Sequence, residues 1–546
     1  MSKTDPLAQV STRRTVQSEQ ADPRQVPNSA GGWGFTASRQ ARLHRFLTLG
    51  TEGGTYYATE KAITRQNADV VLEWARNDAV ALVAEIVTVS VRGRAPRNNP
   101  ALFALAAAAS LGDGDGRRAA FAALPLVART ATHLFTFVSY AEQFRGWGRG
   151  LRNAVGDWYL DKDPDQLAYQ LVKYRQREGW AHRDLLRLAH PVAGERKDAL
   201  TGHRALFDWA CGRGASDFLP PLVLAFEKAQ KATTRDEWVR LIQVTRGLSW
   251  EMLPDAALKE VAVWEALLSA GMPQTALMRQ LPRLTRLGVL TQMSWATGVV
   301  TGQLADRDRL IRGRVHPMNV LLALKTYAGG HSLRGSETWN PVPRVIDALD
   351  AAFYASYAAV EPAMKRTNVA LDISGSMTSP VAGMPMSCRE ASAALALVVA
   401  STEPSTVITG FTAGSSRSKW SGYGTAIAPL GISPRQRLDD AVRTISGLPF
   451  GGTDCALPML WAADGNVSID TFLVVTDNET WAGGIHPHQA LEAYRQKSGI
   501  PARLAVAALT PTEFTIADPD DPGSLDISGF DSAVPGLLAD FSRGDV

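Results

Sequence analysis

The sequence predicts two parts: a long array of α-helices, arranged as a bundle or a helical-repeat solenoid, and then a doubly wound α/β domain. Three observations predict this fold class. Apolar residues recur at the helical period from about Ala37 to Val360, with short Gly- and Pro-bearing breaks. From about Glu361, short and wholly apolar runs alternate with helical stretches, as in a parallel sheet covered on both faces. The net charge changes sign at the same place.

The first residues of the chain show neither pattern. Residues 1–28 are rich in polar residues and proline and lack periodic apolar positions, so we expect a disordered tail. They contain no apolar segment like that of a secretory signal, and the apolar runs at 101–111 and 391–400 are too short to span a bilayer. The three cysteines lack metal-ligand spacing and favour a reducing compartment. We therefore expect a cytoplasmic protein without membrane contact.

The charges of the two regions have opposite signs. Residues 369–546 contain 10 Lys and Arg against 19 Asp and Glu, a net charge of −9. Residues 1–368 contain 47 basic and 35 acidic residues, a net charge of +12. This division suggests that the first region meets a polyanion and the second a cation, although a chance partition between two domains gives the same numbers.

The helical region is assigned to residues 29–365. Glycine and proline separate its helices, for example at Gly112–Gly116 and Pro220–Pro221. A series this long favours a solenoid over a single bundle, and because no clean internal repeat is visible, any repeat is degenerate. The clearest helical stretches are Asn67–Ala75, Ala101–Ser110, Arg117–Val127, Leu167–Glu178, Glu237–Thr245, Leu258–Ala270 and Pro317–Tyr327.

The α/β domain is assigned to residues 366–546. Its predicted strands are short apolar runs bounded by turn residues, which is typical of parallel strands buried on both faces. These runs are Asn368–Asp372, Thr406–Phe411, Thr471–Thr476 and Leu504–Leu509. The helical stretches between them are Arg389–Ala400, Arg437–Ser446 and Pro487–Gln496. Alternation of strand and helix predicts a doubly wound sheet.

Oxygen-bearing side chains follow two of the predicted strands and a glycine-rich loop. An aspartate and two serines alternate directly after the first strand, a threonine follows two glycines, and a second aspartate follows the third strand. Ligands of doubly wound sheets bind beyond the carboxyl ends of the strands, so we expect these side chains to converge. Two carboxylates and three hydroxyls suit Mg²⁺ or another divalent cation that keeps water ligands. The predicted ligands are Asp372, Ser374, Ser376, Thr453 and Asp477.

A simpler explanation exists for part of this pattern. Asp-x-Ser-x-Ser at 372–376 is also common as a turn and helix cap, so the pentapeptide alone would not establish a metal site. The later threonine and aspartate, both at predicted junctions of loop and strand, favour the metal site.

Longer stretches resemble a known family. The sequence DISGS at 372–376 with the later threonine and aspartate resembles the metal-ion-dependent adhesion site (MIDAS) of von Willebrand factor A domains. The stretches Phe450-GGTDCALPM, Val475-TDNETWAGGIHP and Phe514-TIADPDD resemble the A-type domain of the Ro sixty-kilodalton autoantigen family of RNA-binding proteins. The stretches Leu43-HRFLTLGTEGGTYY, Gly146-WGRGLRNAVGDWY, Lys173-YRQREGWAHRDLLRLAH, His316-P and Gly330-HSLRG resemble its TROVE module. The resemblance covers about residues 28–546. It implies a ring or solenoid of HEAT-like helical repeats followed by a von Willebrand factor A domain.

Basic residues gather in and after the predicted helix Leu167–Glu178. Lys173 and Arg177 stand four residues apart in it, where like charges repel by a few tenths of a kcal/mol unless an anion lies nearby. Lysine and arginine neutralise phosphates, and the nearby Tyr174 and Trp180 could stack on bases or simply pack. A solvated helix face is the alternative interpretation. The segment also contains Arg175, His182, Arg183, Arg187 and His190.

The resemblance implies roles for these residues. In the Ro family, residues that match Lys173, Arg177 and His190 contact a small structured Y RNA on the outside of the ring. The hole of the ring accepts single-stranded 3′ ends of misfolded or damaged RNAs. By the same resemblance, the RNA-bound protein could deliver substrates to a 3′–5′ exoribonuclease such as polynucleotide phosphorylase in RNA quality control. Further RNA-facing candidates in matching stretches are Arg149, Arg152, His331 and Arg334.

The sequence offers no convincing catalytic constellation. It lacks an HExxH motif, a nucleophile elbow and a paired Cys-x-x-Cys, so we expect a monomeric scaffold rather than an enzyme. One alternative is a Mg²⁺-dependent protein–protein adhesion or chaperone-like module without an RNA role. Another is a Mg²⁺-dependent nuclease, although two-metal nucleases need a denser carboxylate cluster. Salt-dependent retention of RNA would separate the scaffold from the adhesion module.

Overall fold

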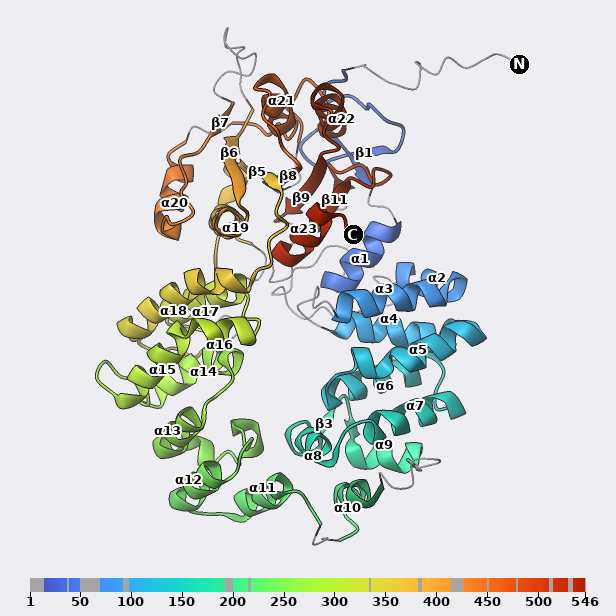
Figure 1. Cartoon of the computed structure of the whole chain (residues 1–546), viewed down its shortest axis with the longest axis vertical. Coiled ribbons are helices and arrows are strands. Elements are labelled where there is room, and N and C mark those ends of the chain that lie inside the picture. The colour runs from blue at the N-terminus through green and yellow to red at the C-terminus, as the bar shows by residue number, and fades with distance from the viewer. Residues whose placement is uncertain are drawn as a thin grey trace. The chain divides into compact units, whose positions relative to one another are not determined.

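The computed structural model forms two compact units (Figure 1). The helical unit comprises Ile63–Val315 and Ala323–Ala355, and the sheet unit comprises Met1–Ala62, His316–Leu322 and Ser356–Val546. No helix in the described part of the chain is long and apolar enough to cross a membrane. The structure describes residues 14–36, 39–49, 69–91, 98–191, 200–214, 218–332, 335–381, 385–413, 426–448, 451–477, 480–509, 514–528 and 534–545.

The described part of the helical unit is built from helices joined by short loops, with one small hairpin. Helix α17 (Pro317–Gly329) crosses the division between the two units. The first helices are α2 (Asp69–Asn77), α3 (Ala79–Val91), α4 (Asn99–Leu111), α5 (Gly114–Val127), α6 (Ala131–Phe144), α7 (Arg149–Leu160), α8 (Pro164–Lys173) and α9 (His182–Ala189). The later ones are α10 (Leu200–Ala210), α11 (Pro221–Lys231), α12 (Arg235–Val244), α13 (Val261–Ala270), α14 (Gln274–Arg286), α15 (Trp295–Ala305), α16 (Arg307–Arg312) and α18 (Pro343–Ala355).

The early helices stack in a regular way. Helix α3 packs against α5, α4 against α6, α5 against α7, and α7 against α9, so each contacts the helix two places further along. This is the contact pattern of stacked helical pairs, and it confirms the predicted array. Side-chain caps set where several helices begin: the side chains of Asp113, Thr130 and Asp163 accept hydrogen bonds from backbone N–H groups three residues on, at the start of α5, α6 and α8.

The predicted helix Leu167–Glu178 is wrong in its last turn. Helix α8 ends at Lys173, and the antiparallel hairpin of β3 (Gln176–Arg177) and β4 (Trp180–Ala181) follows. Both central residues of its turn have positive φ, 53° at Glu178 and 79° at Gly179, which matches a tight hairpin turn and not a helix. The repulsion expected between Lys173 and Arg177 on one helical face therefore does not apply.

The core of the sheet unit is a six-stranded sheet with the order β11-β9-β8-β5-β6-β7. All neighbouring strands are parallel except β7, which pairs antiparallel with β6 at one edge. The strands are β5 (Arg366–Asp372), β6 (Ser405–Phe411), β7 (Ile427–Pro429), β8 (Thr471–Thr476), β9 (Arg503–Ala508) and β11 (Ser524–Ser528). The four strands predicted from the sequence are confirmed. In the sheet, β5 lies between β6 and β8, so the chain passes from one side of β5 to the other between these two strands.

Helices cover both faces of this sheet, as the apolar strands predicted. Side chains on one face, including Ala370, Phe472 and Val506, pack in one cluster with residues of α21 and α22. Helix α19 contacts β5 and β6, and α23 contacts α19 and β9. The helices of the sheet unit after β5 are α19 (Cys388–Thr402), α20 (Leu438–Ser446), α21 (Leu457–Asp464), α22 (Pro487–Ser498) and α23 (Val534–Arg543). The architecture is the predicted doubly wound one.

The disordered tail expected at residues 1–28 is wrong from residue 14 on. Strands β1 (Gln25–Pro27), β2 (Trp33–Thr36) and β10 (Phe514–Thr515) form a small antiparallel sheet, and α1 (Arg39–Leu49) contacts β11. Gln17 is fully buried: its side-chain amide donates to Asp454 Oδ1 and to the Ile485 carbonyl, both at 2.8 Å. Hydrogen bonds to the C-terminal domain hold this segment in place although it has few apolar residues. Residues 1–13 lie outside the described part.

Candidate metal site and nucleic-acid surface

Two carboxylates lie at the carboxyl ends of neighbouring parallel strands. Asp372 ends β5 and is fully buried, and Asp477 directly follows β8. The backbone N–H of Ser374 donates to Asp372 Oδ1 and the Thr476 hydroxyl donates to Oδ2, both at 2.8 Å. Burial, together with the nearby Asp477 charge, raises the pKa of Asp372 to about 6. This is the point where the strand order reverses, where doubly wound sheets hold ligands.

The two predicted serine ligands come together beside this carboxylate. Ser374 begins the short 3₁₀ turn Gly375–Thr378, and its Oγ lies 3.0 Å from Oγ of Ser376. Ser374 is buried and Ser376 is exposed, so the pair leads from the strand end to the surface. The alternating spacing therefore brings both hydroxyls to one point, as the sequence predicted.

Thr453 is buried on the loop before α21. Its carbonyl accepts hydrogen bonds from the backbone N–H groups of Trp481 and Ala482, both at 3.2 Å, which ties this loop to the one that follows β8. Gly452 is needed there, since a Cβ atom would lie 2.6 Å from the Trp481 ring. Two residues on, the Cys455 thiol donates to Thr476 Oγ1 over 3.9 Å, so the loop reaches the end of β8.

The donor set fits a divalent cation by its chemistry. Carboxylate and hydroxyl oxygens are hard ligands, and two carboxylates with hydroxyls suit Mg²⁺ with some water ligands. Asp372 is a buried carboxyl without a basic partner among the described residues, the situation that a bound cation would relieve. The described residues contain no group of three or more His, Cys, Asp or Glu side chains that could hold a metal ion. A site here would therefore use hydroxyls alongside its two carboxylates.

The predicted RNA-facing residues after α8 differ in how far they reach the surface. Lys173 is half-buried: its Nζ donates to the Tyr169 hydroxyl at 2.8 Å and lies 3.6 Å from a carboxylate oxygen of Glu251. Five others are exposed. These are Arg175, Arg177, Arg183, Arg187 and His190.

His182 is not a surface residue, so its predicted role in contacting RNA is wrong. Its Nε2 donates to the Tyr174 carbonyl at 3.0 Å, and its Nδ1 accepts from the Tyr159 hydroxyl at 2.8 Å. Burial lowers its pKa to about 4, so the ring is neutral. The side chain instead fixes the start of α9 against the end of α8, and so positions the exposed cations on either side of it.

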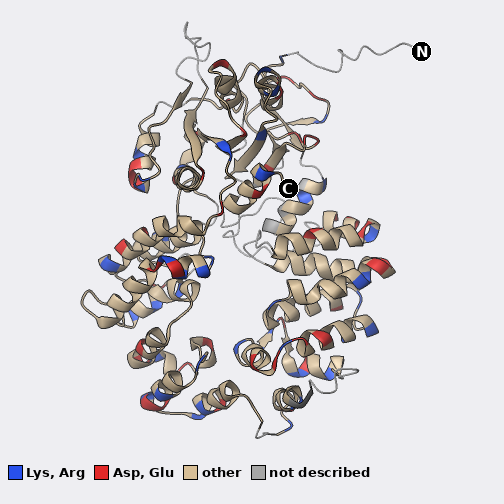
Figure 2. Cartoon of the chain, in the orientation of Figure 1, with Lys and Arg blue, Asp and Glu red and all other residues tan. Residues whose placement is uncertain are grey.

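The remaining candidates lie in other places. Arg149 and Arg152 are exposed in the first turn of α7. His331 is exposed after α17, and its Nδ1 donates to the Gly329 carbonyl at 2.8 Å. Arg334 lies outside the described residues. Figure 2 shows that basic and acidic residues are interspersed along the ribbon of the helical unit, so its basic residues are not confined to one helix.

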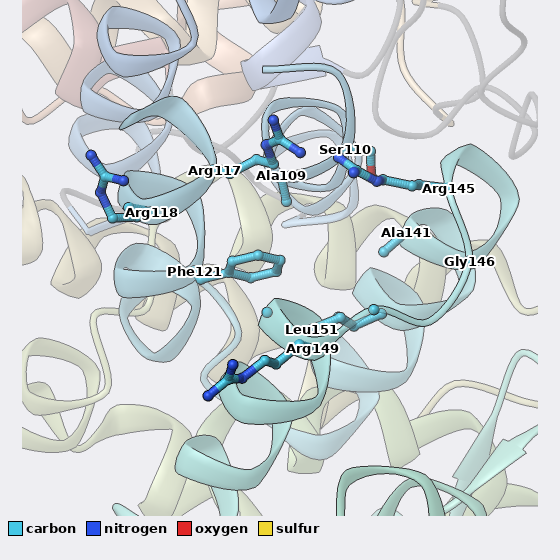
Figure 3. A pocket seen from close by; sticks show the side chains of 12 residues that line it. Ala109, Ser110, Arg117, Arg118, Phe121, Ala141, Arg145, Gly146, Arg149 and Leu151 are labelled. Carbon is cyan, nitrogen blue, oxygen red and sulfur yellow. The ribbon is translucent and has the colours of Figure 1, made fainter. Parts of the chain in front are cut away.

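The sequence analysis missed a group of arginines around a pocket (Figure 3). Arg117 and Arg118 on α5 and Arg145 after α6 line it together with Arg149. Arg149 was among the candidates predicted from the sequence, whereas Arg117, Arg118 and Arg145 were not, because their grouping depends on the packing of α5 against α7.

A stacked helical array and a doubly wound domain with oxygen-bearing side chains at its strand ends define a class of two-part proteins. Family models agree: that of the TROVE domain matches residues 26–210 and 239–327, and that of the Ro60 vWA domain matches residues 366–542. This chain belongs to the Ro60 family.

Similar proteins extend over almost the whole chain. It is 42% identical over 538 residues to a Deinococcus radiodurans protein named RNA-binding protein RO60, covering 97% of each. A Caenorhabditis elegans protein of the same name is 33% identical over 606 residues, covering 97% of this chain and 92% of that protein. The crystal structure of Deinococcus radiodurans RO (RSR) protein matches with a TM-score of 0.78 and 40% identity, covering 93% of this chain and all of that one.

Proposed function

We propose that this chain is an RNA-binding scaffold. The helical unit would hold a small structured RNA of the Y type along residues 173–190, and single-stranded ends of misfolded RNA elsewhere on the same unit. One observation carries the proposal: four exposed arginines stand together with His190 on one short segment, residues 173–190, which the buried His182 fixes. The names of the two relatives from other organisms support it.

The segment suits contact with phosphates. Arg183 and Arg187 lie four residues apart on α9, on one side of the helix, and Arg177 stands on the preceding hairpin. Arginine pairs with phosphate through two N–H groups at once. Such contacts fix the position of a duplex or stem without reading its sequence, so the segment would recognise RNA mainly by shape and charge.

The sheet unit would bind Mg²⁺ through Asp372, Asp477 and the neighbouring hydroxyls. When bound, the cation would supply an electrophilic position for an acidic side chain of a protein partner. The proposed partner, implied by the resemblance to the Ro family, is a 3′–5′ exoribonuclease such as polynucleotide phosphorylase. We place this role in the cytoplasm and assign it to a monomer that does not itself cleave RNA.

Charge reversal on the segment tests the RNA role. We expect Arg177→Glu, Arg183→Glu and Arg187→Glu together to weaken binding of a structured RNA at least tenfold at moderate salt, because three phosphate contacts are lost. The matched control is Arg279→Glu on α14, which is exposed and lies outside the segment. Binding is measured by fluorescence anisotropy of a labelled stem-loop. Equal affinities for the triple variant and the control would contradict the assignment.

A further inference from the structure

A pocket of about 320 Å³ opens in the helical unit between α4, α5, the end of α6 and the start of α7 (Figure 3). Four arginines surround it: two from α5, one from the residue after α6, and one from the first position of α7. They are Arg117, Arg118, Arg145 and Arg149. The volume is near the lower end of the range for small-molecule pockets, about 300–1,000 Å³, so it suits one small group and no duplex.

The pocket carries an excess of positive charge. Arg118 pairs with Asp115 of its own helix, and Arg117 Nε donates to the Asp113 carbonyl at 3.1 Å. Neither Arg145 nor Arg149 contacts a carboxylate among the residues that the structure describes, and both are exposed. Clustered cations with so few acidic partners attract an anion.

An aromatic ring forms the middle of the pocket. Figure 3 shows the Phe121 side chain between the arginines, and Ala109, Ala141 and Leu151 extend the apolar lining. The backbone of α7 comes close to this ring, because a Cβ atom on Gly150 would lie 2.7 Å from it. The helix begins after Gly148, which provides no side-chain cap, so the first backbone N–H groups of α7 add positive character to the same wall.

We propose that this pocket binds one unpaired nucleotide of an RNA strand. The base would stack on the Phe121 ring, and an adjacent phosphate would lie between Arg145 and Arg149. An aromatic face beside arginines is the combination that single-stranded nucleic acids use, since every base can stack and every phosphate can pair. Bases in a stem are already stacked and paired, so the pocket selects unpaired RNA. The inference rests on the proposed RNA role and names a subsite for it.

The test compares variants of the full chain with an unstructured RNA dodecamer and a labelled stem-loop. Phe121→Leu keeps apolar bulk but removes the stacking face, and should weaken dodecamer binding roughly fivefold to a hundredfold. Arg145→Gln with Arg149→Gln should also weaken it and lower the dependence on salt by roughly one to two phosphate contacts. Phe121→Tyr should bind like the wild type, and so should Arg279→Gln. Stem-loop binding should stay unchanged in all of them.

The outcomes distinguish the proposed nucleotide pocket from the proposed RNA-binding function of the whole helical unit. If Phe121→Leu and the double arginine variant bind the dodecamer as the wild type does, the pocket assignment is overturned while stem-loop binding stands. If adenosine monophosphate binds the pocket more tightly than the dodecamer, the site is one for free nucleotides and the strand proposal fails. If the wild-type protein binds neither RNA at low salt, the scaffold proposal fails as well. Since Arg145 and Arg149 are exposed, their variant remains informative even where a Phe121 variant unfolds.

Discussion

At the scale of residues, the two carboxylates at the ends of β5 and β8 are the candidate ligands for a cation in the sheet unit. Asp372 is buried with its two oxygens held by Ser374 N–H and the Thr476 hydroxyl, beside a second carboxylate. Such an arrangement is costly without a cation, because buried carboxyls favour the neutral form. A bound divalent ion would allow both carboxylates to stay charged.

Removing this carboxylate should abolish cation binding. In Asp372→Asn the side chain keeps its shape but loses its charge, so we expect Mg²⁺ no longer to raise the melting temperature, as it should in the wild type. Asp464→Asn is the control, since that carboxylate is exposed at the end of α21 and, among the residues that the structure describes, forms an ion pair with Lys497 alone. Titration calorimetry gives the affinity directly. Unchanged Mg²⁺ binding by Asp372→Asn would mean that the ion sits elsewhere.

The buried His182 predicts a dependence of stability on pH. Its pKa is about 4 in the folded chain and about 6.5 when unfolded, so the folded state holds fewer protons between these values. The stabilisation is complete above about pH 6.5 and is lost as the pH falls toward 4, amounting to about 3 kcal/mol at 1.36 kcal/mol per unit. Urea unfolding at pH 7 and pH 5 measures the larger part of this difference, about 2 kcal/mol, because the folded state still excludes the proton at pH 5. The His182→Gln variant should show a flatter pH dependence, and a difference as steep as in the wild type would refute this role.

The sequence located most of these residues because their positions follow from local rules. Neighbouring parallel strands end at the same edge of the sheet, so side chains that follow them lie near one another, and the metal candidates could be proposed without coordinates. His182 could not be judged in this way. Its burial depends on Tyr159, which lies on another helix, and no periodicity around residue 182 signals that contact.

At the scale of elements, the hairpin between α8 and α9 decides where the cations stand. Its turn at Glu178 and Gly179 has two positive φ angles, and it places Arg177 opposite Trp180. The predicted helix extended too far because the helical spacing of apolar residues continues past Lys173, where α8 ends. Few turn-forming residues follow to mark that end. Glycine after a polar residue is the signal that was available.

Changing the turn glycine should affect binding through the shape of the hairpin. Gly179 has φ +79° and open space around it, so Gly179→Ala costs about 1 kcal/mol in backbone strain without a clash. We expect this variant to bind a stem-loop with lower affinity, because the strained turn changes the conformation of the hairpin. In Gly298→Ala, which lies inside α15 with open space around it, stability should stay equal or rise. Thermal unfolding measures the stability of both variants, and fluorescence anisotropy measures their affinity for the stem-loop. If Gly179→Ala binds the stem-loop as tightly as the wild type, the hairpin has no role in RNA binding.

At the scale of the whole molecule, the two regions of the chain differ in both net charge and fold. Residues 1–368, which include the helical array, have a net charge of +12 and suit an anionic polymer, and the acidic residues 369–546 suit a cation. Apolar periodicity predicted both folds, since it reports burial directly. The N-terminal segment escaped prediction because its contacts join residues far apart in the sequence. Of the pocket arginines only Arg149 was predicted, because the pocket forms where separate helices pack together.

The dependence of RNA affinity on salt concentration shows whether the helical unit holds RNA through its phosphates. If the helical unit holds RNA through phosphates, the logarithm of the association constant for a stem-loop should fall linearly with the logarithm of salt concentration. The triple variant Arg177→Glu, Arg183→Glu and Arg187→Glu should give a slope shallower by roughly two to three. If the affinity of the wild-type protein for the stem-loop does not change with salt, or if no binding occurs at low ionic strength, the helical unit does not hold RNA through phosphates.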